Sequence, residues 1–118
     1  MRVIVYGSLR RKQGNHHWMT DAQLLGEHRL DGYEIYDLGH YPAVIRGEGT
    51  IECEVYRITP PILTELDALK KNAQEYQREL IETPYGKAWI YLYQLSVEGL
   101  QRITSGDWLK RHGEEENE

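Results

Sequence analysis

A glycine and a serine directly follow the first apolar run of the chain, in the order Tyr6, Gly7, Ser8 and Leu9. Glycine admits backbone conformations that turn consecutive N–H groups toward one point, so a strand that ends there can present several donors to an anion. The Ser8 hydroxyl adds a further donor or acceptor. The pattern therefore indicates either a cradle for a carboxylate or phosphate, formed by residues 6–9, or a plain turn after a strand.

A basic cluster, formed by Arg10, Arg11 and Lys12, comes next along the chain. Beside an anion cradle it would attract a negatively charged ligand, but no apolar neighbour anchors these long side chains. We therefore expect the cluster to be a solvated turn.

Short motifs spread over nearly the whole chain are typical of one protein family. They are Val5-Tyr6-Gly7-Ser8-Leu9-Arg10 with Gly14, then Gly39-His40-Tyr41-Pro42-Ala43-Val44, Glu54-Val55-Tyr56, Leu66-Asp67-Ala68-Leu69 and Tyr76-Gln77-Arg78. In this order they resemble the gamma-glutamylcyclotransferase-like (AIG2-like) family. The ending Ser105-Gly106-Asp107-Trp108-Leu109 resembles a bacterial branch of that family.

The resemblance implies an enzyme that closes a gamma-glutamyl amide to 5-oxoproline and releases an amine or amino acid. The free α-amino group attacks the γ-carbonyl of the same molecule in an intramolecular aminolysis. No metal or other cofactor is expected, because the enzyme mainly fixes the geometry of the attack. The resemblance also implies that the backbone of residues 6–9 holds the α-carboxylate of this small molecule. The expected substrate-binding residues are Tyr6, Gly7, Ser8, Leu9, Tyr41, Tyr76 and Arg78.

The reaction needs a base, because the α-ammonium group of the substrate must lose a proton before it attacks. In the family a Glu usually stands three residues after the Asp of the Leu-Asp pair, whereas this chain has Lys70 there, followed by Lys71. An ammonium group offers no acceptor and repels the substrate ammonium unless burial makes it neutral. Glu75 is the nearest carboxylate in that stretch. We expect Glu75 to be the catalytic base, oriented by Tyr76 or Arg78.

Other interpretations of the same residues stay open. Glu75 can equally be a solvent-facing charge at the start of a strand. Asp67 falls off the apolar face of its expected helix, which favours a cap or local pairing, and Glu54 matches a structural position of the family. If Lys70 has replaced the base, the protein is a non-catalytic small-molecule binding module. A third alternative is a protein-interaction domain that uses exposed tyrosines and the acidic tail.

The histidines offer a metal site as an alternative. His17 and Asp21 have the i, i+4 spacing of two ligands on a helix, but His16 would point away from His17 there. No third ligand follows at a telling spacing, so we expect no metal. His40 lies beside Tyr41 and either lines a pocket or has a structural role.

Length and composition favour one small globular domain. With 118 residues the chain can build a single core, and we assign residues 1–112 to one domain and residues 113–118 to an acidic, disordered tail. The net charge of -5 argues against nucleic acid as a partner, and no apolar run has the length of a membrane span. The lone Cys53 is expected in the core. This single cysteine and an apolar run that starts within three residues of Met1 favour a cytoplasmic protein. We also expect a monomer.

Short strands separated by Gly, Pro and Asn turns dominate the pattern. The expected strands are residues 2–6, 23–29, 32–38, 43–46, 50–58, 76–83 and 87–94. Thr83-Pro84-Tyr85-Gly86 predicts a type I turn that joins the last two strands as a hairpin. A helix should begin after a cap at Thr59, where two prolines follow, and end near Lys70 or Lys71.

Many strands with one or two short helices predict an α+β fold, because one short helix cannot cover an open sheet. The expected architecture is a small mixed, partly closed β-barrel. The family resemblance implies the same fold.

Overall fold

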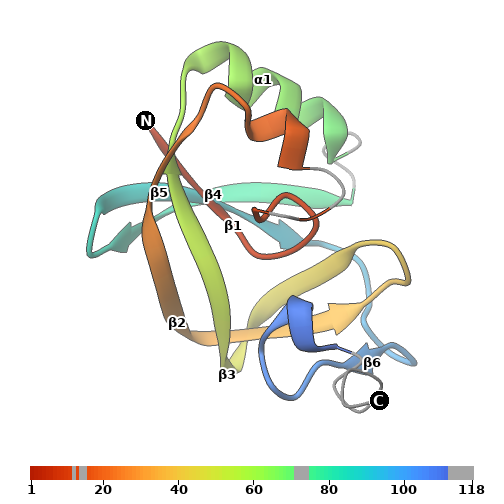
Figure 1. Ribbon diagram of the computed structural model, residues 1–118. Helices are drawn as coiled ribbons and strands as arrows, with labels where there is room; N and C mark the ends of the chain where they lie inside the picture. Colours follow the sequence, from red (N-terminus) through yellow and green to blue (C-terminus); the bar gives the residue numbers. More distant parts are fainter. Residues whose placement is uncertain (12, 14–15, 71–74, 112–118) are drawn as a thin grey trace, which may run out of the picture.

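A single curled sheet dominates the computed structural model, which describes residues 1–11, 13, 16–70 and 75–111 (Figure 1). Its strands are β1 (Arg2–Val5), β2 (Gln23–Asp37), β3 (Pro42–Arg57), β4 (Tyr76–Thr83), β5 (Gly86–Tyr93) and β6 (Gln101–Arg102), in the order β4-β5-β1-β3-β2-β6. The helical segments of the described chain are the 3-10 helix η1 (His16–Met19), the α-helix α1 (Pro60–Leu69) and the 3-10 helix η2 (Trp108–Lys110). β1 runs parallel to β5, and the other neighbouring strands are antiparallel. The mixed α+β half-barrel predicted from the sequence is confirmed.

Both faces of the sheet are covered around β1, which explains why this strand is apolar at consecutive positions. Successive side chains of a strand point to opposite faces. Ile4 faces a core that includes Trp108 of η2, whereas Val3 and Val5 face a second core that includes Leu66 of α1. Figure 1 shows α1 on one side of β1 and η2 on the other. The end of β1 is therefore held between two hydrophobic layers.

Strands β2 and β3 form one long bent hairpin in place of the four shorter strands that the sequence predicted. The register shifts between Asp31 and Tyr33, and Gly32 has a φ of 93° there. Gly47 and Gly49 lie inside β3 without ending it. A β-bulge lets a strand bend while its pairing continues, so the glycines that suggested turns bend the hairpin instead.

The β4–β5 hairpin and α1 follow the sequence predictions closely. Thr83 pairs with Gly86 across a two-residue turn, and Gly86 has a φ of 108° that suits glycine. Lys70 is the C-cap of α1, as expected. Thr59 occupies the N-cap position, as expected, although its side chain makes no capping hydrogen bond. The prolines at the first helical positions mark the start of α1.

Some predictions fall on residues that the structure does not describe. Lys12, Gly14, Lys71 and the tail of residues 113–118 lie outside the described residues. The division into one domain and an acidic tail therefore stays a prediction. No helix within the described part of the chain is both long and apolar enough to span a membrane.

Candidate active site

The loop that follows β1 packs tightly against the start of β3. A Cβ atom placed on Gly7 would lie 2.4 Å from Cγ and 2.8 Å from Cδ of Pro42. Gly7 has no positive φ, so glycine is required here by close approach and not by an unusual backbone conformation. The N–H of Arg10 donates to the carbonyl of Gly7 at 2.9 Å, which closes the loop as a turn.

Replacing Gly7 by Ala is expected to destabilise the fold by about 1–3 kcal/mol, because the new methyl group meets the rigid ring of Pro42. Urea denaturation measures this loss. Adding Pro42→Ala to Gly7→Ala should recover part of it, since the clashing ring atoms are then absent. A Gly7→Ala protein as stable as the wild type would show that the loop can move away from Pro42.

A cavity of about 250 Å³ lies beside this loop. It is bounded by four segments: the loop after β1, the turn between β2 and β3, the end of α1 and the start of β4. Its lining residues are Ser8, Leu9, Leu38, Tyr41, Leu69, Lys70, Glu75 and Tyr76. A narrower pocket shares Ser8, Leu9 and Lys70 with this cavity and adds Gly7 and Tyr91. Segments far apart in the sequence thus enclose a space that suits a small molecule.

Glu75 lines this cavity from the position just before β4. Its carbonyl accepts a hydrogen bond from the N–H of Gln94 at 2.8 Å, which fixes its backbone, and its side chain is half-buried. Its neighbour Tyr76 donates its hydroxyl to the carbonyl of Pro42 at 3.0 Å and is held in the wall. A half-buried carboxylate at a cavity can take a proton from a bound molecule and return it.

Lys70 directs its ammonium group toward three tyrosine rings. Its Nζ lies 5.2 Å from the ring centre of Tyr6, 4.8 Å from that of Tyr76 and 5.7 Å from that of Tyr91. The face of an aromatic ring is electrostatically negative and attracts a cation. Burial lowers the pKa of Lys70 from 10.5 to about 8, because the charged form loses hydration. The group is therefore still mainly an ammonium ion at neutral pH.

The predicted binding tyrosines occupy different places in the site. The hydroxyl of Tyr6 donates to the carbonyl of Tyr91 at 2.6 Å, and burial raises the pKa of Tyr6 well above its usual value. Tyr6 lines the narrower pocket and not the larger cavity. Tyr41 is 54% exposed and lies at the rim of the cavity.

Arg78 lies in a neighbouring open groove and not in the cavity. Its Nε donates to both carboxylate oxygens of Asp67, at 3.0 and 3.3 Å, and its guanidinium lies 4.3 Å from the ring centre of Trp89. Asp67 also accepts a hydrogen bond of 2.6 Å from the hydroxyl of Tyr91. The expectation that Asp67 caps its helix or pairs locally is wrong, because its partners lie on β4 and β5. Arg78 pairs with Asp67 and not with Glu75, which it was expected to orient.

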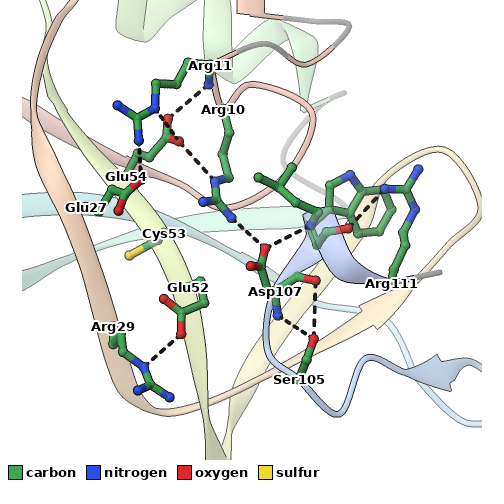
Figure 2. Close-up of polar contacts among 12 residues, drawn as sticks. Arg10, Arg11, Glu27, Arg29, Glu52, Cys53, Glu54, Ser105, Asp107 and Arg111 are labelled. Atoms are coloured by element: carbon green, nitrogen blue, oxygen red, sulfur yellow. Dashed lines mark hydrogen bonds and ion pairs between the residues drawn. The ribbon is translucent and has the colours of Figure 1, made fainter. Parts of the chain in front are cut away.

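The prediction of a solvated basic turn is wrong for Arg10. Arg10 is 5% exposed, with its Nε 3.2 Å from Glu54 and its Nη1 3.0 Å from Asp107 (Figure 2). Glu54 is 1% exposed and also accepts hydrogen bonds from the N–H of Arg11 and the hydroxyl of Tyr56. Two carboxylates therefore hold the guanidinium group inside the fold, because a buried charge needs such partners.

This buried cluster ties the loop after β1 to β3 and to the C-terminal segment. Asp107 also accepts a hydrogen bond from the N–H of Leu109 at 2.9 Å, which caps η2. The partners of Arg10 lie 44 and 97 residues away in the sequence, so no local sequence pattern could predict the ion pairs. The structural role expected for Glu54 agrees with these contacts.

His16, His17, His40 and Cys53 are not among the residues that line the cavity. His16 and His17 belong to the 3-10 helix η1, and Asp21 lies beyond its end, so the helical spacing assumed for a metal pair does not apply. Within the described residues, no group of three His, Cys, Asp or Glu side chains could hold a metal ion. His40 is exposed. Cys53 is buried in the core, as expected, and burial raises the pKa of its thiol to about 12.

Comparison with known proteins assigns the chain to a defined family. The family model for gamma-glutamyl cyclotransferase, AIG2-like proteins matches residues 3–110. The chain belongs to this family. The gamma-glutamylcyclotransferase family protein YtfP of Escherichia coli is 60% identical over 111 residues, which cover 94% of this chain and 98% of that protein. The resemblance that the short motifs predicted is confirmed, including the bacterial branch.

Solved structures of the family share the fold described above. The solution NMR structure of Escherichia coli YtfP has a TM-score of 0.80, covering 95% of this chain and 99% of that one. A crystal structure of a Pyrococcus horikoshii protein, 27% identical, has a TM-score of 0.87 and covers 99% of this chain and 97% of that one. The half-barrel is therefore common to relatives whose sequences have diverged widely.

Proposed function

We propose that the protein is a gamma-glutamylcyclotransferase that closes a gamma-glutamyl amine or peptide to 5-oxoproline and releases the amine. The observation that carries this proposal is the cavity of about 250 Å³, which is lined both by Glu75 and by Ser8 of the loop after β1. Membership of the family supports the same activity. A carboxylate at one point of the cavity complements the ammonium group of such a substrate.

In the proposed reaction the α-amino nitrogen of the substrate attacks its own γ-carbonyl carbon. A new carbon–nitrogen bond closes the ring, and the amide bond to the departing amine breaks. The α-ammonium group loses two protons and the departing nitrogen gains two, so no proton is consumed overall. Glu75 accepts the first of these protons and returns it to the departing nitrogen.

The rest of the cavity acts by positioning. The backbone of residues 6–9 holds the α-carboxylate, while Tyr41 and Tyr76 provide aromatic surface for the aliphatic part of the substrate. Correct placement of two reacting groups can lower a barrier by about 7–11 kcal/mol. A reaction within one molecule therefore needs no cofactor in this proposal.

The proposal is tested by measuring 5-oxoproline release from a panel of gamma-glutamyl amines and gamma-glutamyl dipeptides. The wild-type protein should release 5-oxoproline from at least one member, with an equal amount of the amine. A folded protein that binds 5-oxoproline but turns over no member of the panel would support the alternative, a non-catalytic binding module in which Lys70 stands where the family usually has its base.

A further inference from the structure

Lys70 connects the loop after β1 with the cavity that contains Glu75. It lines that cavity together with Ser8, and it lines the narrower pocket together with Gly7 and Ser8. Within the described residues, no carboxylate forms an ion pair with Lys70. Lys70 therefore borders both pockets beside the loop after β1, and its positive charge has no acidic partner among the described residues.

The tyrosine rings around Lys70 favour an anionic ligand. Ring faces attract the ammonium charge, but they accept its N–H groups only weakly. The ammonium group has lost part of its hydration, which the lowered pKa of Lys70 also reflects. A carboxylate that enters the cavity supplies the charge-assisted hydrogen bonds that the rings do not.

We propose that Lys70 is a specificity-determining residue that binds the α-carboxylate of the gamma-glutamyl group, together with the backbone of residues 6–9. This role rests on the proposed function and narrows its substrates to compounds with a free α-carboxylate. Glu75 on the same cavity wall faces the α-ammonium group, so the two charges of the cavity match the two charges of an α-amino acid head group. Lys70 is then the anchor, and Glu75 is the base.

The same contacts argue against Lys70 as the base. A proton acceptor must be a neutral amine, and a neutral amine loses the attraction of the three ring faces. The ammonium form predominates below a pH of about 8, given the pKa of Lys70. The tyrosines therefore favour the form of Lys70 that binds anions.

Two ring compounds test the anchor without requiring turnover: 5-oxoproline carries the carboxylate, and 2-pyrrolidinone is the same ring without it. NMR titration should show that the wild type binds 5-oxoproline in clear preference to 2-pyrrolidinone. Lys70→Met should weaken 5-oxoproline binding about 10–100-fold, the range expected for a lost hydrogen bond to a charged group. Lys70→Arg should retain most of the affinity, and Lys70→Gln repeats the loss with a polar side chain if Lys70→Met folds poorly.

Lys110→Met is the matched control, because Lys110 is an exposed lysine that does not line the cavity. It should bind both ring compounds as the wild type does. Two results would overturn the proposal. One is a wild type that does not prefer 5-oxoproline, and the other is folded Lys70→Met and Lys70→Gln proteins that bind 5-oxoproline as well as the wild type does.

A kinetic comparison separates this proposal from the proposed function. The substrates are a gamma-glutamyl amide and the 4-aminobutanoyl amide with the same departing amine but no α-carboxylate. Lys70→Met should lower kcat/KM for the first substrate and leave the second unchanged. If neither substrate reacts but 5-oxoproline binding still depends on Lys70, the proposed cyclisation activity is wrong and the carboxylate-binding role of Lys70 is supported. If the gamma-glutamyl amide reacts but 5-oxoproline binding does not depend on Lys70, only the proposed role of Lys70 is wrong.

Discussion

Replacing Glu75 by Gln is expected to reduce 5-oxoproline release by about 10²–10⁴-fold, the usual effect of removing a general base. The amide keeps the shape of the side chain but cannot accept the proton of the α-ammonium group. The measurement is kcat/KM for the best substrate of the panel. Binding of 5-oxoproline should be unchanged, because this product no longer carries an ammonium group that needs Glu75.

Glu82→Gln is the matched control, because Glu82 is an exposed carboxylate on β4 that does not line the cavity. It should react at the wild-type rate. Full activity in Glu75→Gln would exclude Glu75 as the base and direct attention to Asp67 in the neighbouring groove. If the wild type is inert, Lys70→Glu becomes the informative variant, since it returns a carboxylate to the position where the family usually has one.

Replacing Arg10 by Met is expected to lower the free energy of unfolding by about 3–5 kcal/mol, as for other buried pairs that lose one partner. The change takes a guanidinium group away from Glu54, which is 1% exposed, and from Asp107, which caps η2. Guanidinium chloride denaturation measures the loss. Folded domains are stable by only about 5–15 kcal/mol, so this one side chain, with its two ion pairs, would account for a large share of the total.

Arg29→Met on the same sheet provides the comparison. Arg29 forms an ion pair of 2.8 Å with Glu52, but its side chain is 71% exposed (Figure 2). An exposed pair contributes about 0–1 kcal/mol, so this variant should be close to the wild type. Arg10→Lys should also lose stability, because one ammonium group cannot reach Glu54 and Asp107 with the fork of a guanidinium group. Equal losses for Arg10→Met and Arg29→Met would show that burial adds nothing to the Arg10 contacts.

Several features of the fold follow from local sequence pattern. The apolar run of β1, the strands β4 and β5, and the turn at Gly86 lie where the pattern predicted them. Thr59 and the prolines after it placed the start of α1 correctly. These features are decided by neighbours in the chain, through side-chain alternation and the restricted backbone of proline. The order of the motifs also identified the family.

The roles of the charged residues depend on contacts between distant parts of the chain. Arg10 and Lys70 are both basic residues, and the sequence gives no sign of their different surroundings. Arg10 is buried against two carboxylates, whereas Lys70 lies among three tyrosine rings beside a cavity. The need for glycine at position 7 likewise comes from Pro42, the first residue of β3. The free energy of a buried charge depends on the partners that replace its lost water, and here those partners come from distant parts of the chain.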